Sequence, residues 1–228
     1  MKPVGILGGM GPDATILLMR RVLAAVPDAR DDADHVPLIV HQNPQVPSRI
    51  EALIDGTGAD PAPVLVAMAQ DLQRAGAVAL AMPCNTAHAY ADAVRGATTL
   101  PFLDMVALSV RALVARGARR VGMLASPAVR KAGVFDVPFA AAGLEAVHAR
   151  DDGAELLKII RAVKAGQGRA DLGPALEHEA RAMQRDGADH VLVACTEISL
   201  LEGNLPTGIG ITDSLDCLTG AIVTAARA

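Results

Sequence analysis

Two segments of this 228-residue chain match each other, and each carries a cysteine at the same place. In the first segment Arg74 precedes an apolar run that ends at Cys84. In the second segment Arg185 precedes an apolar run that ends at Cys195. Each cysteine therefore lies ten residues after its arginine. A repeat of this kind indicates two copies of one structural unit.

The openings of the two halves support the duplication. Residues 4–8 and residues 121–125 share an apolar pattern with glycine at the second position. If each cysteine ends an equivalent strand, a pseudo-two-fold axis would bring the two thiols to opposite sides of one cleft. Two opposed thiols suit a reaction that removes a proton from one face of a carbon and returns it to the other.

Composition limits the classes of partner. With 51% apolar and 20% charged residues, the chain can form one large domain or two domains of about 100 residues each. A net charge of −4 and a pI near 5.8 leave no basic surface for nucleic acid. Aromatic residues make up 2% of the chain, so stacking platforms for bases are not expected.

The sequence lacks features that would indicate secretion, a membrane span or a metal site. The start of the chain lacks a secretory signal, and no apolar stretch approaches the roughly 20 residues that span a bilayer. Three cysteines without a signal peptide fit a reducing cytoplasm. Their spacing contains no CxxC element, which argues against a zinc site. We expect a cytoplasmic protein without membrane contact or metal.

Short β-rich runs alternate with Ala-rich helical stretches, which predicts βαβ units. Continuous apolar runs predict strands at 3–8, 36–41, 77–82, 120–124 and 190–194. Helical periodicity predicts helices at 13–25, 62–75, 87–95, 105–116, 154–165, 170–185 and 214–226. Strands without polar alternation indicate that helices cover both faces of a parallel sheet. We predict an α/β fold of two similar doubly wound lobes related by pseudo-two-fold symmetry, with the active site between them.

A proline-containing break places the junction between the lobes near residue 103. We expect a first lobe at 1–103 and a second at 104–212, with a C-terminal helix at 213–228 that packs back on the first. Asp104 and Asp213 follow the two cysteines by 20 and 18 residues, and each precedes an apolar helix as an N-cap residue would. Ligands of such sheets bind beyond the carboxyl ends of the strands, where both cysteines fall.

A glycine-rich turn at 8–15 closes the first strand and opens the first helix. Free N–H groups at such a helix start attract anions, including carboxylates. The turn also fits GxGxxA, but the second strand ends at 41–43 in His-Gln-Asn without the acidic residue that would bind a ribose. No GxxxxGK[ST] motif is present. A nucleotide cofactor is therefore not expected, and a tight turn without a ligand stays an alternative.

The cysteines have a structural and a catalytic interpretation. A single free cysteine is most often a small buried hydrophobe. Cys84 and Cys195 occupy duplicated positions beside hydroxyl or amide residues, which favours a catalytic role. A thiol beside a helix N-terminus has its thiolate stabilised, as a base that acts on carbon requires. Cys217 lies inside an apolar helix and is predicted to belong to the core.

Polar residues follow both cysteines. Asn85, Thr86 and Thr196 offer donors that could hold a substrate carboxylate, although Asn and Thr also cap helices. Glu197 could orient a binding group or complete a cap, and the sequence leaves both alternatives open. His88 lies one helical turn after the first cysteine and is predicted to be structural rather than catalytic.

Two cations are candidate ligands for an anionic substrate. Arg49 follows a proline-rich loop after the second strand, and Lys164 ends a helix just before a glycine. A lysine in a last turn is also commonly explained by its interaction with the helix dipole, so this alternative stays open.

At this point the residues resemble a known family. Residues 80–88 and 192–198 look like the two signature segments of the aspartate/glutamate racemase family. Residues 5–15 and 34–49 resemble its aspartate racemase branch, and the similarity covers the whole chain. The resemblance implies two α/β lobes with the active site between them. It also implies that no pyridoxal phosphate, metal or nucleotide is needed.

The resemblance assigns roles to individual residues. It implies that Cys84 and Cys195 are the acid/base pair and that Met10 lines the pocket. The chain departs from many relatives at residues 121–127, where they carry a Gly-Thr pair.

The resemblance also implies how the substrate is held. Asn85, Thr86 and Thr196 would bind its α-carboxylate end. Arg49 and Lys164 match positions associated with the acidic side chain in the aspartate-type branch.

The leading hypothesis is a cofactor-independent racemase that interconverts L- and D-aspartate, L- and D-glutamate or both, through two cysteine bases. A decarboxylase or cis–trans isomerase of small diacids is a second hypothesis, and a binding protein without turnover is a third. The expected partner is a small acidic amino acid, and the expected assembly is a homodimer.

Overall fold

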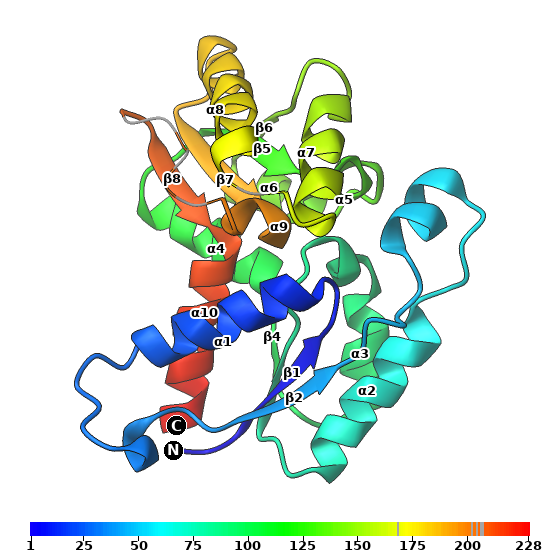
Figure 1. Ribbon diagram of the computed structural model, residues 1–228, viewed down its shortest axis with the longest axis vertical. Helices are drawn as coiled ribbons and strands as arrows, with labels where there is room; N and C mark the ends of the chain where they lie inside the picture. The colour runs from blue at the N-terminus through cyan, green and yellow to red at the C-terminus, as the bar shows by residue number, and fades with distance from the viewer. Residues whose placement is uncertain (168, 202, 204, 206–207) are drawn as a thin grey trace.

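Two four-stranded parallel sheets form the framework of the protein. The computed structural model describes residues 1–167, 169–201, 203, 205 and 208–228. The first sheet has the order β2 (Leu38–Gln42), β1 (Val4–Gly8), β3 (Ala79–Ala81), β4 (Phe102–Leu103). The second has the order β6 (Glu145–Val147), β5 (Arg120–Ala125), β7 (His190–Ala194), β8 (Gly210–Asp213). The equal strand order of the two lobes confirms the predicted α/β architecture (Figure 1).

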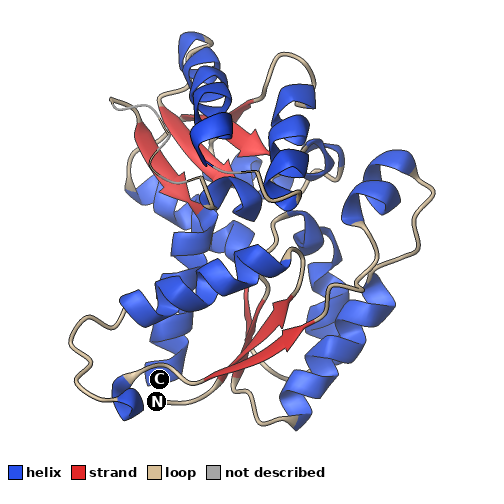
Figure 2. Ribbon diagram, in the orientation of Figure 1, coloured by secondary structure: helices blue, strands red, loops and turns tan. Residues whose placement is uncertain are grey.

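Helices cover both faces of each sheet, as Figure 2 shows. The first lobe contains α1 (Pro12–Ala24), η1 (Asp32–Asp34), η2 (Glu51–Asp55), α2 (Ala62–Arg74), η3 (Thr86–Tyr90) and α3 (Ala91–Ala97). Between the strands of the second sheet lie α5 (Pro127–Lys131), α6 (Asp136–Ala142), α7 (Ala154–Lys164), α8 (Arg169–Arg185) and α9 (Thr196–Ser199). The chain passes from the first sheet to the second through α4 (Met105–Ala115) and ends in α10 (Ser214–Arg227).

The alternation of side chains along each strand sends them into two cores. In β1, Ile6 faces the core formed with α1 and α10, whereas Leu7 faces the core formed with α2. In β7, Val193 packs with α7 and α8, whereas Leu192 packs with α4 and α6. Since both faces of β1 and β7 are buried, these two strands read as continuous apolar runs.

The last helix packs on the first sheet. Leu215, Leu218 and Ile222 of α10 share a core with Val4 and Ile6 of β1. The N–H of residue 2 also donates to the carbonyl of residue 226 at 2.7 Å, which places the two termini close together (Figure 1). The division of the chain at 103/104 into separate domains stays a prediction.

The ends of several elements differ from the sequence prediction. The helix expected at 87–95 is divided into η3 and α3. The strands β4, β6 and β8 contain only two to four residues, too few to produce a recognisable pattern. The two predicted caps are confirmed: Asp104 accepts a hydrogen bond from Ala107 N at 2.9 Å, and Asp213 from Leu215 N at 2.8 Å.

Candidate active site

Both cysteines of the duplicated segments line one cavity. Cys84 follows β3 and Cys195 follows β7, which hold the same position in the two sheets. Their exposed fractions are 8% and 7%, so both thiols are largely shielded from bulk water. The cavity has a volume of about 40 Å³, and its other lining residues are Met10, Ser48, Arg49, Ile50, Thr86, Ser126, Ile160, Lys164 and Glu197. The structure thus brings together seven of the nine site residues named from the sequence.

The turn between β1 and α1 carries Met10 to the cavity. Gly9 has a φ of +92°, and a Cβ at this position would lie 2.4 Å from the carbonyl carbon of Asn43. Only glycine allows the two turns to approach this closely. The Gly9 N–H donates to the Thr15 hydroxyl at 2.9 Å, which fixes the turn to the first helix. Met10, 3% exposed, consequently lines the cavity together with the cysteines instead of lying in solvent.

Cys195 is held as a thiol by the residue two positions later. Its Sγ donates a hydrogen bond to Glu197 Oε2 at 3.2 Å. Burial and the negative charge of Glu197 raise the pKa of the Cys195 thiol well above its usual range. The expectation that a helix start stabilises both thiolates is therefore wrong for Cys195, because burial and an adjacent carboxylate outweigh the four-residue helix α9.

Lys164 completes a chain of charges that reaches Cys195. Its Nζ lies 3.3 Å from Glu197 Oε1, and the side chains are 43% and 9% exposed. The lysine partly offsets the carboxylate, since its charge lowers the pKa of Cys195. Lys164 thus lines the cavity, and its charge interacts with Glu197 as well as with the helix dipole.

Arg49 stands between this cavity and a larger one. Its Nη1 donates to the carbonyls of Val46 and Pro47 at 3.2 and 2.9 Å, which anchors the guanidinium to its own loop. Its Nε is buried without a hydrogen-bond partner among the described residues. A neighbouring cavity of about 400 Å³ shares Ser48, Arg49, Lys164 and Glu197 with the inner one. Both cations therefore lie on the boundary between the two spaces.

Asn85 and Thr196 are used differently from the other predicted residues. The Asn85 amide donates to Ser214 Oγ at 2.9 Å, and the Ser214 hydroxyl donates to the carbonyl of Val193 at 2.8 Å. The Thr196 hydroxyl donates to the carbonyl of Pro83 at 3.3 Å. These bonds tie the segments that follow β3 and β7 together. The described lining of the inner cavity does not include either side chain, so their contact with a substrate stays a prediction.

A second hydrogen bond between the lobes passes through a residue that the sequence did not single out. Thr86 Oγ1 and Ser126 Oγ lie 3.1 Å apart, and both line the inner cavity. Ser126 comes directly after β5, as Gly9 comes directly after β1. The matching openings of the two halves were the available signal for this residue. Ile50 and Ile160 gave none, since an isoleucine next to an active site looks like any core residue.

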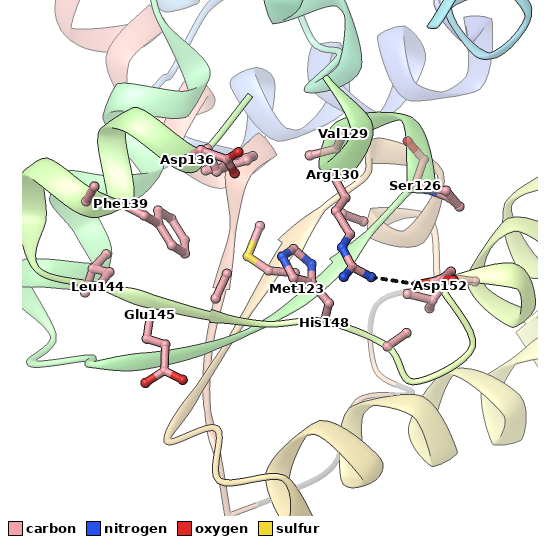
Figure 3. Close-up of a pocket in the computed structure, with 18 residues that line it drawn as sticks. Met123, Ser126, Val129, Arg130, Asp136, Phe139, Leu144, Glu145, His148 and Asp152 are labelled. Carbon is pink, nitrogen blue, oxygen red and sulfur yellow. Dashed lines mark hydrogen bonds and ion pairs between the residues drawn. The ribbon is translucent and has the colours of Figure 1, made fainter. Parts of the chain in front are cut away.

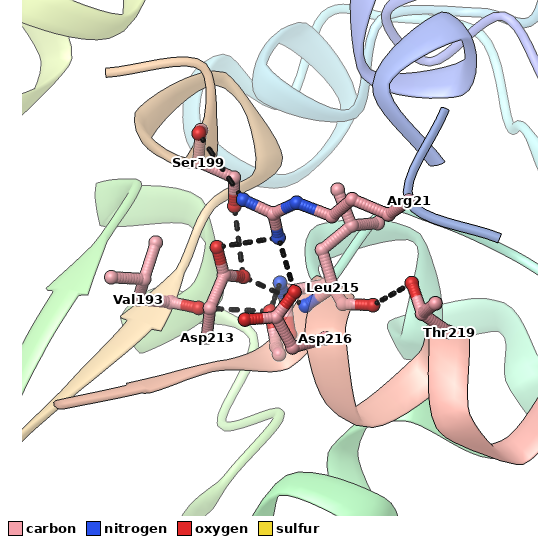
Figure 4. A network of polar contacts seen from close by, with 9 residues as sticks. Arg21, Val193, Ser199, Asp213, Leu215, Asp216 and Thr219 are labelled. Atoms are coloured by element: carbon pink, nitrogen blue, oxygen red, sulfur yellow. Dashed lines mark hydrogen bonds and ion pairs between the residues drawn. The ribbon is translucent and has the colours of Figure 1, made fainter. Parts of the chain in front are cut away.

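An ionic network fixes α9 to the first lobe (Figure 4). Arg21 Nη1 of α1 lies 2.8 Å from Asp213 Oδ2 and 3.0 Å from Asp216 Oδ1. The Ser199 hydroxyl at the end of α9 donates to Asp213 Oδ1 at 2.9 Å. Burial raises the pKa of Asp213, and the charge of Arg21 opposes this shift. The segment that carries the second cysteine is therefore anchored at both ends.

His88 forms a hydrogen bond with the backbone of the first cysteine. Its Nδ1 lies 2.9 Å from the carbonyl oxygen of Cys84, and its Nε2 accepts a hydrogen bond from Met105 N at 3.1 Å. These contacts define a neutral ring whose Nδ1–H donates to the carbonyl. Burial lowers the pKa of His88, which agrees with a neutral ring. Its position agrees with the structural role predicted from the sequence.

No group of three or more His, Cys, Asp or Glu side chains in the described ranges is arranged to hold a metal ion. No helix in the same ranges combines the length and the apolar character needed to cross a membrane.

The fold and the paired cysteines define a class of enzyme, and comparison with known families agrees. Residues 7–222 match the profile of the Asp/Glu/Hydantoin racemase family. The chain belongs to this family and is an isomerase, a racemase.

Individual relatives cover nearly the whole chain. The broad specificity amino-acid racemase RacX of Bacillus subtilis (strain 168) is 25% identical in an alignment 226 residues long that covers 96% of this chain and 96% of its own. The aspartate racemase of Picrophilus torridus is 27% identical, with a TM-score of 0.89 over 100% of this chain and 95% of its own. A variant of arylmalonate decarboxylase shares the fold at 20% identity, with a TM-score of 0.59 over 99% and 93% of the two chains.

Proposed function

We propose that this enzyme interconverts L- and D-aspartate, with glutamate as a further substrate, by a two-base proton transfer at the α-carbon. The observation that carries the proposal is the convergence of Cys84 and Cys195, from equivalent strand ends, on one cavity. The aspartate racemase of Picrophilus torridus, 27% identical with a TM-score of 0.89, supports aspartate as the first substrate to test.

The proton moves between the two sulfurs through the substrate carbon. The Cys84 thiolate takes the α-proton, and the Cys195 thiol donates its proton to the opposite face of the planar carbon. The product leaves with inverted configuration, Cys84 as a thiol and Cys195 as a thiolate, and a turnover in the reverse direction restores the start. Assignment of Cys195 as the acid in this direction follows from its hydrogen bond to Glu197, which keeps the thiol protonated.

Charge stabilisation must supply most of the rate, since an α-proton beside a carboxylate is very weakly acidic. Proton transfer by a side chain typically contributes about 10²–10⁴-fold. Preorganised charges and dipoles contribute further where water is excluded. Arg49 and Lys164 would hold the side-chain carboxylate at the boundary of the two cavities. Thr86 would donate a hydrogen bond to the α-carboxylate from the inner cavity. Asn85 and Thr196 would do so after giving up their present hydrogen bonds to Ser214 and Pro83.

Access to the thiols requires the site to widen. The inner cavity of about 40 Å³ is far below the roughly 300 Å³ at the lower end of small-molecule sites, whereas the outer cavity has about 400 Å³. The substrate would enter from the outer space, and separation of the lobes would break the Thr86–Ser126 hydrogen bond. Closure around the substrate would then exclude water from the carbanion.

Deuterium incorporation separates racemisation from the alternatives. Incubation of L-aspartate in heavy water should give D-aspartate with deuterium at the α-carbon and without release of carbon dioxide. Release of carbon dioxide from small diacids, or their cis–trans isomerisation without chirality change in aspartate, would favour the second hypothesis. Binding of aspartate without exchange or inversion over hours would favour a binding protein.

The proposed chemistry involves no cofactor. Chelators and carbonyl reagents should leave the rate unchanged, whereas thiol alkylation should inactivate the enzyme and aspartate should protect it. Recovery of a chelator-inhibited enzyme by added metal would contradict this proposal. The cytoplasmic location and the homodimer also stay predictions, and light scattering of the purified protein would test the second.

A further inference from the structure

A second cavity lies in the second lobe, among residues 123–156 (Figure 3). Its volume is about 310 Å³, close to the roughly 300 Å³ at the lower end of small-molecule sites. Several large apolar side chains of its walls are less than 9% exposed, namely Met123, Phe135, Phe139, Leu144 and Leu156.

Charges of both signs stand among these apolar walls. Arg130 Nη1 lies 3.1 Å from Asp152 Oδ1, an ion pair whose carboxylate is 95% exposed. Asp136 lines the same cavity and makes no ion pair within the described part of the chain. Such an exposed pair contributes little to stability and exchanges partners readily. The cavity therefore offers one cation and one unpaired carboxylate to a ligand.

His148 lines the same cavity as Arg130 and Asp136. Figure 3 shows its ring beside Arg130, and no hydrogen bond or ion pair joins it to another described residue. Burial and then the charge of Arg130 lower the pKa of His148, while Asp136 raises it. The neutral ring has one donor and one acceptor nitrogen without a protein partner. A polar ligand would satisfy both.

We propose that this cavity binds a zwitterionic amino acid with an aliphatic or aromatic side chain. Its carboxylate would pair with Arg130, its ammonium group with Asp136, and its side chain would pack against Phe135 and Phe139. The acidic substrate of the catalytic site does not fit the apolar walls, because burial of a second carboxylate without a cation is costly.

The second cavity shares one residue with the catalytic cavity. Ser126 lines both, and its hydroxyl lies 3.1 Å from that of Thr86 in the opposite lobe. A ligand that fills the second cavity would therefore reach the residue whose hydrogen bond would break if the lobes separate. Occupancy of the cavity consequently alters the affinity for the acidic substrate, and this coupling alone depends on the proposed racemase activity.

Calorimetry on the full-length protein tests the site without reference to catalysis. L-phenylalanine and L-leucine should each bind at a single saturable site, and saturating L-aspartate should not displace them. Arg130→Gln and Asp136→Asn should each weaken binding by about tenfold or more, as expected for a lost charge-assisted hydrogen bond. The control Cys84→Ser should bind as the wild type does. Absence of saturable binding, or displacement by aspartate, would overturn the proposal.

Two analogues test the zwitterion and one assay tests the coupling. 3-Phenylpropanoate lacks the ammonium group and 2-phenylethylamine lacks the carboxylate, so both should bind more weakly than phenylalanine. Equal binding of either analogue would overturn the assignment of the charges. Saturating phenylalanine should change KM for aspartate by about fivefold in the wild type and leave it unchanged in Arg130→Gln. Unchanged KM and kcat in the wild type, with binding intact, would overturn the coupling alone.

Discussion

The thiol of Cys195 donates a hydrogen bond to the carboxylate of Glu197 at 3.2 Å, and the carboxylate is held on its other side by Lys164. This arrangement favours the protonated form of Cys195 before substrate arrives, because burial and the charge of Glu197 raise the pKa of this proposed catalytic thiol. The predicted two-base reaction needs one thiol and one thiolate at its start. The unequal surroundings of the cysteines therefore set a preferred starting state.

Replacement of Glu197 by glutamine should lower the pKa of Cys195, because the amide removes a negative charge that disfavours the thiolate. Alkylation of Cys195 by iodoacetamide should then proceed at lower pH than in the wild type, as followed by site-resolved mass spectrometry. Lys164→Met removes a positive charge and should move the profile of Cys195 in the opposite direction. A Glu197→Gln profile that coincides with that of the wild type would show that the carboxylate does not control this thiol.

Each catalytic cysteine should be indispensable for inversion. Cys84→Ser and Cys195→Ser should each lower the racemisation rate by at least about 10²-fold, because a hydroxyl is a far weaker acid than a thiol. Each variant should still exchange the α-proton of one enantiomer with heavy water through the remaining thiol. Chiral chromatography and proton NMR measure the two reactions.

The matched control for these variants is Cys217→Ala. Cys217 is half-buried in α10 and does not line the catalytic cavity, so its replacement should leave racemisation unchanged. Near wild-type inversion by either serine variant would rule out the two-thiol mechanism.

The sequence predicted those parts of the fold that local pattern determines. Continuous apolar runs located β1, β5 and β7, and acidic residues before apolar helices located the caps Asp104 and Asp213. Strands as short as β6 (three residues) form only because β5 provides a hydrogen-bonding edge, so no local signal marks them.

The site was predictable in position but less so in chemistry. Duplication led to both cysteines, and the structure places them on one cavity. The raised pKa of Cys195 could not be derived, since it depends on tertiary burial and on the direction in which the Glu197 side chain points. The partner of Asn85 also lay beyond the sequence, because Ser214 is distant in the chain and reaches it only after α10 packs on the first lobe.

Buried neutral histidines should make the fold sensitive to acid. Burial lowers the pKa of His88 and of His190 below the ordinary value of 6.5, so the unfolded chain binds more protons than the folded protein below that pH. The free energy of unfolding is therefore not reduced by these histidines above pH 6.5. It decreases as the pH falls from that value toward their lowered pKa values in the folded protein. Urea unfolding at about pH 7.5 and about pH 5.5 should show a lower midpoint at the acidic pH.

His88→Asn retains a donor for the carbonyl of Cys84 but loses the acceptor for Met105 N. This variant should be less stable at neutral pH, and its urea midpoint should differ less between the two pH values than that of the wild type. His178→Asn at an exposed position should leave that difference unchanged. A wild-type midpoint that does not fall on acidification would contradict the role of the buried rings.

The two cations at the boundary of the cavities should determine substrate choice. If Arg49 and Lys164 hold the side-chain carboxylate, Arg49→Leu should lower kcat/KM for aspartate and glutamate much more than for alanine. A charge-assisted hydrogen bond contributes about 1.5–3 kcal/mol, which corresponds to roughly one to two powers of ten in specificity. Lys164→Met should act in the same direction and less strongly, because lysine acts as a point charge whereas arginine binds in a fork.

The ratio of kcat/KM values separates specificity from other effects of these variants. Arg49 also anchors its loop through Val46 and Pro47, and Lys164 also lowers the pKa of Cys195, so both variants should slow every substrate to some degree. Loss of the contact with the side-chain carboxylate should appear as a further decrease in kcat/KM for aspartate and glutamate but not for alanine. Arg74→Leu removes an exposed arginine of the same lobe and should leave the ratio unchanged. Equal losses for aspartate, glutamate and alanine in both variants would show that these cations are structural, and the acidic substrate would lose its main support.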